Sequence, residues 1–135
     1  MKIAICLEKS GGFSFNNRRL SQDAVIQSKI SESAGDGRVC LNRSSSKLFQ
    51  TKDNLAISEN FISESSGNDI CFIENMPLPD LEKVSMVYLF KWNRDYPADK
   101  YFSCDLLSKN FKKVKTENLI GNSHKKITLE IYERR

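Results

Sequence analysis

A single histidine, His124, limits the chemistry that this chain can perform. Zinc sites in proteins usually take several histidine and cysteine ligands. The four cysteines are widely spaced and form no Cys-x-x-Cys pair: Cys6, Cys40, Cys71 and Cys104. The first three fall in apolar runs typical of buried strands, where a free cysteine packs as a small hydrophobic residue. The sequence therefore predicts no metal site and no bound cofactor.

Motifs that bind phosphate or activate a nucleophile are also absent. There is no P-loop, dinucleotide fingerprint or nucleophile elbow, and the pair Gly11-Gly12 is too weak a signal by itself. Ribonuclease chemistry without a metal needs an acid and a base beside the ribose hydroxyl. His124 could take such a role with Asp95, Asp99 or Lys125, although a lone histidine is more often structural. We therefore predict no catalytic residue.

Basic residues form a candidate anion-binding site. We expect a final helix to begin at Asn122 or Ser123, which places His124 and Lys125 in its first turn. Cations there oppose the helix dipole by up to about 1 kcal/mol, and such local conflicts tend to occur at functional sites. The alternative is that the lysines extend into solvent at little cost. The anion-binding candidates are Arg18, Arg19, Ser123, His124 and Lys125.

An aromatic and charged segment follows the clearest predicted strand, at 86–91. Pro97 favours an extended residue before it and a turn at the end of that strand. Tryptophan, tyrosine and arginine carry much of the binding energy at protein interfaces. We therefore predict a partner-binding surface at this turn; the alternative is a buried corner in which the charged residues pair with one another. The candidates are Trp92, Arg94, Asp95, Tyr96 and Asp99.

Hydrophobic patterning predicts the elements that position these residues. Strands are expected at 2–7, 39–41, 55–57 and 70–73, with helices at 22–34 and 44–49 between them. Further strands at 86–91, 101–106 and 111–116 follow one another too closely for helical crossovers. We predict a single α/β domain over residues 1–135, with a mixed sheet, an N-terminal βαβα half, a more antiparallel C-terminal half and a closing C-terminal helix.

Composition and charge agree with a small folded protein. The 135 residues are 39% hydrophobic and 28% charged, which is ordinary for one globular domain. A net charge of +4 favours an anionic partner only mildly. The apolar run at the N-terminus is too short for a signal peptide or a membrane-spanning helix. We therefore expect a cytoplasmic protein that does not enter a membrane.

Four segments together resemble a small bacterial family of single-domain proteins. They are residues 1–5 (MKIAI), 15–23 (FNNRRLSQD), 92–99 (WNRDYPAD) and 121–128 (GNSHKKIT). Some members of this group carry a ribonuclease label, and others are similar to immunity proteins of contact-dependent growth inhibition systems. The zinc-dependent tRNA-processing nuclease that the label implies needs a histidine cluster, which this chain lacks. The resemblance therefore implies an immunity protein.

Two functions from different classes follow from these observations. The leading prediction is a non-catalytic, antitoxin-like immunity protein that binds a nuclease toxin domain and covers its active site. The alternative is a nucleotide- or RNA-binding protein, extending to a metal-independent ribonuclease-like enzyme, which would hold phosphate with Arg18, Arg19, His124 and Lys125. A nucleic acid is the weaker partner prediction, and the oligomeric state and the strand order stay open.

Overall fold

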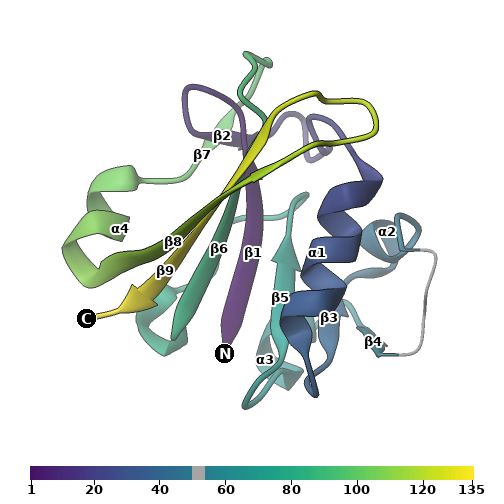
Figure 1. The fold of residues 1–135 in the computed structure, drawn as a ribbon. Coiled ribbons are helices and arrows are strands. Elements are labelled where there is room, and N and C mark those ends of the chain that lie inside the picture. Colours follow the sequence, from purple (N-terminus) through teal and green to yellow (C-terminus); the bar gives the residue numbers. More distant parts are fainter. Residues whose placement is uncertain (50–53) are drawn as a thin grey trace.

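The fold is built on a mixed β-sheet that runs through the whole molecule. The computed structural model describes residues 1–49 and 54–135, and within them the sheet has seven strands in the order β4-β3-β5-β1-β6-β9-β8 (Figure 1). The first five strands in this order pair in parallel. Strand β9 pairs antiparallel with both β6 and β8. Their bounds are β1 (Lys2–Leu7), β3 (Val39–Leu41), β4 (Leu55–Ile57), β5 (Ile70–Ile73), β6 (Met86–Lys91), β8 (Phe111–Leu119) and β9 (Ile127–Arg134).

Strand β1 occupies the centre because it is apolar on both faces, as buried parallel strands are. Ile3 and Ile5 join the core on one side of the sheet, while Ala4 joins the core on the other. Backbone pairing sets Ile3 opposite Cys71 of β5 and opposite Val87 of β6. The register therefore aligns the carboxyl ends of these three strands at one edge of the sheet.

Helices cover both faces of the sheet. Helix α1 (Ala24–Ala34) and the short α2 (Arg43–Ser46) lie on one face, with the inward stripe of α1 formed by Ile26, Ile30 and Ala34 at spacing four. Helices α3 (Phe61–Glu64) and α4 (Cys104–Asn110) lie on the other face with the 3₁₀ turn η1 (Leu81–Lys83). Figure 1 shows α1 in front of β5 and β3, and α4 at the opposite side of the molecule.

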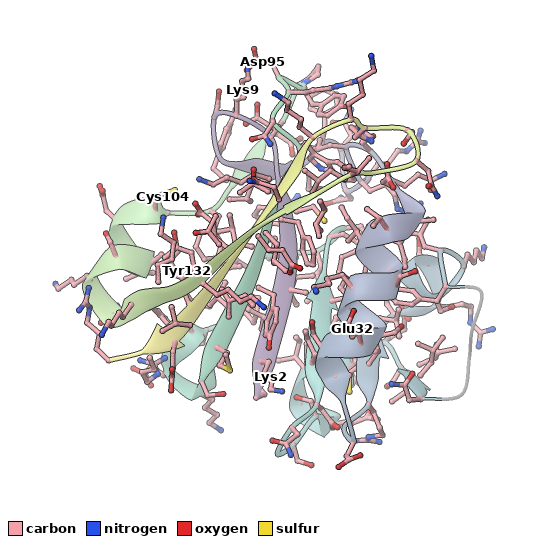
Figure 2. All side chains as sticks on the ribbon, viewed as in Figure 1. Lys2, Lys9, Glu32, Asp95, Cys104 and Tyr132 are labelled. Carbon is pink, nitrogen blue, oxygen red and sulfur yellow. The ribbon has the colours of Figure 1, made fainter. Side chains whose placement is uncertain are left out.

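Loops gather beyond the carboxyl ends of the parallel strands. A small second sheet pairs β2 (Gly12–Ser14) with β7 (Lys100–Tyr101) in this region. The Asp99 carboxylate accepts a hydrogen bond of 3.0 Å from the Asn16 backbone, which ties the loop after β2 to the loop before β7. Figure 2 places Lys9 and Asp95 at this end of the molecule, opposite Lys2.

The structure confirms the single α/β architecture with its mixed sheet, but the closing helix predicted from residue 122 or 123 is wrong. Residues 127–134 form strand β9 instead, paired with both β6 and β8. Ile127, Leu129 and Ile131 alternate along it and face one core, so the period of two prevails over the spacing of four. Similarly, the strand predicted at 101–106 ends at Tyr101, and α4 begins after its N-cap Ser103.

The described residues contain no helix that is long and apolar enough to span a membrane.

Candidate functional site

A crevice lies at the carboxyl ends of the parallel strands. The crossover from β1 to β3 runs through α1 on one face, whereas the crossover from β5 to β6 runs through η1 on the other face and in the opposite direction. Open α/β sheets bind ligands outside the carboxyl ends of the strands at such a switch point. In this chain Glu8, Asn42 and Glu74 directly follow β1, β3 and β5. Acidic and amide groups therefore line this edge.

The crevice lies between α1, α2 and the ends of β1, β5 and β6, and it is almost closed. Its cavity measures about 10 Å³, which is close to the least space that one water molecule needs. The walls combine apolar, aromatic and polar side chains. They are Cys6, Phe13, Arg19, Leu20, Ser21, Gln22, Gln27, Leu48, Phe72, Glu74 and Trp92.

An ion pair crosses the mouth of the crevice. Arg19 Nη2 donates to Glu74 Oε1 at 2.7 Å, and Arg19 Nε lies 3.1 and 3.0 Å from Oε1 and Oε2. The hydroxyl of Ser45 donates to the same Oε1 at 2.6 Å. The Glu74 side chain is only 6% exposed, whereas that of Arg19 is 29% exposed. A buried carboxylate is therefore satisfied by a guanidinium that retains access to solvent.

An amide and a thiol also line the crevice. Gln27 is 8% exposed, and its side chain lines the cavity. Burial raises the pKa of the Cys6 thiol, and the nearby negative charge of Glu74 raises it further. The crevice is thus lined by a neutral thiol, an anionic carboxylate and an amide that can both donate and accept hydrogen bonds.

A larger hollow lies directly outside this crevice. Its cavity of about 510 Å³ falls within the range of small-molecule sites. Arg19 and Leu20 line both spaces, so these two side chains form the partition between them. Phe15 is 42% exposed on the wall of the hollow. The remaining lining residues are Asn16, Arg18, Tyr96 and Pro97.

The predicted residue His124 is buried in a structural network beside the crevice. Its Nδ1 lies 3.3 Å from Asp23 Oδ2, and its Nε2 lies 3.1 Å from Ser21 Oγ and 3.0 Å from Tyr96 Oη. The imidazole also packs on Trp92, with ring centroids 4.5 Å apart. His124 is 4% exposed. It therefore fixes the loop after β8 against α1.

Asp23 anchors the same network. Burial alone would raise the pKa of its carboxyl, but the backbone N–H groups of Asn122, Ser123 and Val25, together with the Ser123 hydroxyl, hold that pKa below its ordinary value. The backbone N–H of His124 also donates to Oδ2 at 3.0 Å. The carboxylate is occupied by the protein itself, which makes it a structural group.

The sequence-predicted candidates separate into several places. Trp92 is 3% exposed and belongs to the core, so its side chain is not available at the surface as the partner-binding prediction required. Arg94 and Asp95 lie exposed at the end of the molecule. The helix N-terminus expected to bind anions is absent because residues 122–126 form a loop. Ser123 binds Asp23 there, while Lys125 is exposed.

The arginines and the remaining candidates divide in the same way. Arg18 is exposed on the outer hollow, Arg19 binds Glu74, Tyr96 reaches His124, and Asp99 holds the Asn16 backbone. Sequence reasoning missed the residues that make the crevice polar: Gln27, Ser45 and Glu74. The signal for Glu74 was its place directly after the apolar run 70–73, where a parallel strand presents its carboxyl end.

Comparisons with known proteins identify the fold. No family model and no curated protein matches this chain. Among solved structures, it is similar to dihydrofolate reductase from Enterococcus faecalis complexed with NADP(H) and RAB-propyl, with a TM-score of 0.67 and 11% sequence identity. The match covers 99% of this chain and 95% of that chain. This likeness shows that the chain has the fold of dihydrofolate reductase.

The fold corrects the function expected from the sequence. An immunity or toxin–antitoxin role in contact-dependent growth inhibition is wrong on this finding, because the chain matches the fold of dihydrofolate reductase over nearly its whole length. The ribonuclease-like alternative also loses its basis, since His124 is buried and the helix expected to begin at Asn122 or Ser123 is a loop followed by strand β9. The family resemblance and the nuclease toxin partner stay predictions that no comparison tests.

Proposed function

We propose that this chain binds a flat nitrogen heterocycle in the crevice, through an edge that resembles a guanidinium group. The class includes 2-aminopyrimidines and the pterins that contain such a ring. The observation that carries the proposal is the Arg19–Glu74 pair, in which a guanidinium already occupies the buried carboxylate. The edge of a protonated 2-aminopyrimidine also presents two parallel N–H donors, so it fits the same carboxylate.

Exchange of Arg19 for a ligand needs little rearrangement. Arg19 is partly exposed, so its guanidinium can turn into solvent without losing hydration. Its departure would join the outer hollow of about 510 Å³ to the crevice. Glu74 would exchange one pair of charge-assisted hydrogen bonds for another and keep the bond from Ser45. The Arg19–Glu74 ion pair therefore closes the binding site until a ligand replaces Arg19.

The rest of the crevice suits a flat ring. Phe72 and Trp92 provide aromatic and apolar surface against which a heterocycle can pack. The amide of Gln27 offers a donor and an acceptor to a second edge of the ring. Such a mixture of apolar walls with a few fixed polar groups is typical of small-molecule sites.

The nicotinamide dinucleotide named in the neighbouring structure does not fit this site. A pyrophosphate needs glycines that let the backbone approach it and a positive electrostatic environment. The ends of β3 and β5 carry Asn42 and Glu74 instead, and the Glu74 carboxylate is buried at that point. Arg19, the cation nearest to it, is already neutralised. We therefore propose ligand binding without hydride transfer from NADP(H).

The proposal is tested by titration with 2,4-diaminopyrimidine and with dihydrofolate. Binding can be followed by calorimetry and by the fluorescence of Trp92, the single tryptophan, which lines the crevice. The wild-type chain should bind at least one of the two compounds, and NADPH should not bind or be oxidised in their presence. A wild-type chain that binds neither compound contradicts the proposal, and NADPH oxidation contradicts the exclusion of hydride transfer.

The cytoplasmic location expected from the sequence is also kept as a proposal.

A further inference from the structure

Strand β8 forms one edge of the seven-stranded sheet. It is the last strand in the sheet order, so in the described part of the chain only its inner side pairs with another strand, β9 (Figure 1). Its nine residues extend over about 30 Å. The outward N–H and C=O groups of an edge strand can pair with another extended chain.

The surface along β8 is open on both sides of the strand. Residues 112–116 are all exposed, including Val114, whose exposed fraction is 48%. The opposite edge of the sheet, β4, has only three residues. Proteins commonly keep edge strands short or cover them, because a long open edge pairs with other chains. Strand β8 is therefore the edge at which a partner strand can add.

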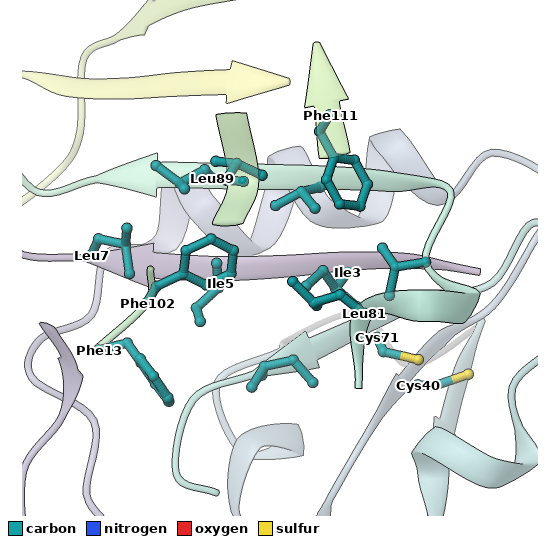
Figure 3. Close-up of a cluster of buried hydrophobic side chains, with 14 of the residues drawn as sticks. Ile3, Ile5, Leu7, Phe13, Cys40, Cys71, Leu81, Leu89, Phe102 and Phe111 are labelled. Carbon is teal, nitrogen blue, oxygen red and sulfur yellow. The ribbon is translucent and has the colours of Figure 1, made fainter. Parts of the chain in front are cut away.

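Both ends of β8 are fixed. The Phe111 side chain is 1% exposed, and in Figure 3 it points into the buried cluster that contains Leu89. The guanidinium of Arg134 lies 4.7 Å from the centroid of the Phe111 ring. At the other end, Asp23 accepts a hydrogen bond of 3.0 Å from the backbone N–H of Asn122 and holds the loop after β8. The edge is thus ordered in advance, which reduces the entropy cost of binding.

Lysines make this edge positively charged. Strand β8 contains Lys112, Lys113 and Lys115 but only one acidic residue, Glu117. Lys112 and Lys115 pair with residues that are two apart on β9, so their side chains project from the same face of the sheet. Lys113 projects from the other face, where its ammonium lies 3.4 Å from Glu130. Both faces of the edge therefore carry positive charge.

We propose that β8 binds an acidic, extended segment of another protein, which adds to the sheet as a further strand. Main-chain hydrogen bonds provide the affinity in this mode of recognition, and the lysines select carboxylates. A second copy of the chain does not fit, because two adjacent β8 strands would place lysines against lysines. Lysines on an edge also disfavour neutral strands, so they restrict the edge to acidic partners.

A bulge determines how the segment lies on the edge. The register of β8 shifts between Lys113 and Lys115, and a bulge there bends the strand and increases its twist. The regular part from Lys115 to Leu119 therefore pairs with a segment of about five residues. Carboxylates at the end of that segment reach Lys112 and Lys113. The inference does not depend on the proposed heterocycle site, because residues from other elements line the crevice and the outer hollow.

The test is fluorescence polarisation with a labelled acidic peptide, EEETVTVTEEE, whose central part can pair with β8 in either direction. The wild-type chain should bind it, and Lys112→Gln/Lys115→Gln should bind it about tenfold more weakly. Lys9→Gln/Lys47→Gln removes the same charge at two exposed lysines outside β8 and should leave the affinity unchanged. Equal loss in the two double variants, or no binding by the wild-type chain, overturns the proposal.

Amide hydrogen exchange of the wild-type chain distinguishes strand addition from electrostatic attraction alone. The acidic peptide should slow the exchange of β8 amides, whereas the same peptide with N-methyl groups on its five central residues should bind weakly and protect none. Equal binding of the N-methylated peptide, or displacement of the acidic peptide by an equal concentration of oligouridylate, would show general anion attraction and refute the proposal. Protection of β8 in a chain that sediments as a dimer without peptide would assign the edge to a second copy and refute it as well.

Discussion

The guanidinium of Arg19 covers the buried carboxylate of Glu74, with Nη2 and Oε1 2.7 Å apart. The two residues come from distant parts of the chain, the loop after β2 and the end of β5, and they meet over a crevice that is otherwise lined by apolar, aromatic and uncharged polar side chains. Arg19 also donates to the Ser44 carbonyl at 3.2 Å. The ion pair therefore connects the 15–20 loop to β5 and α2, and it closes the mouth of the crevice.

Removal of the Arg19 side chain should lower the stability of the free protein and raise its affinity for the ligand. Arg19→Ala leaves the Glu74 carboxylate buried without its cation, which should lower the free energy of unfolding by about 1–3 kcal/mol. Affinity for 2,4-diaminopyrimidine should increase, because Arg19 no longer competes for the carboxylate, and saturating ligand should recover part of the stability. Urea unfolding with and without ligand measures both effects. Arg94→Ala, at an exposed arginine that lines neither cavity, should change neither quantity.

Asp23→Asn should disrupt the network around His124. The Asp23 side chain is fully buried and accepts N–H groups from Asn122, Ser123 and His124. An amide nitrogen in place of one oxygen cannot accept, so about 2–3 kcal/mol of unfolding free energy should be lost. Chemical denaturation measures the change, and Asp36→Asn, at an exposed carboxylate, should have almost no effect. Equal stability of both variants would contradict the role of Asp23.

Stability should decrease below about pH 4 because of two carboxylates. The pKa of Asp69 is lowered mainly by hydrogen bonds from Arg38, and the pKa of Asp23 is lowered by backbone N–H groups despite its burial. A carboxylate with a depressed pKa in the folded state contributes stability above its unfolded pKa and loses that contribution as the pH falls. Urea midpoints between pH 3 and pH 7 should show this slope. The slope should become shallower in Asp69→Asn, and an unchanged slope would refute the assignment.

Gly121→Ala tests the close approach of the loop after β8 to α1. A Cβ atom at this position would collide with Asp23 Oδ2 and with the carbonyl oxygen of His124, which are held in place by the network. We expect a loss of about 2–3 kcal/mol, since a tightly packed site yields little. Gly67→Ala is the comparison: it meets no atom within 4 Å but has a φ of +55°, so only the backbone cost of about 1–2 kcal/mol applies. Thermal unfolding compares the two.

Hydrophobic patterning predicted much of the sheet but could not distinguish its last element. The runs 3–7 in β1, 70–73 in β5 and 86–90 in β6 are continuously apolar, which fits buried parallel strands. In β9, Ile127 and Ile131 fit a helical spacing of four as well as alternation. The choice is made by pairing with β6 and β8, a tertiary interaction that the local pattern does not contain.

The candidate site was harder to predict because its key contacts join distant residues. His124 looked available in the sequence, yet Asp23, about a hundred positions earlier, satisfies it. Glu74 looked like an ordinary acidic residue after a strand, and only the fold brings Arg19 onto it. Burial and pairing determine whether each of these side chains is available to a ligand. Neither property can be read from residue type and spacing.

The most direct test of the account is calorimetric titration of 2,4-diaminopyrimidine into the wild-type chain and into Glu74→Gln. The glutamine keeps the size of the side chain and can still accept a hydrogen bond from Ser45, but it has no charge for a guanidinium-like edge. We predict binding to the wild-type chain and a loss of about tenfold or more in Glu74→Gln. Equal binding by both proteins, or no binding by the wild-type chain, would contradict Glu74 as the group that recognises the ligand.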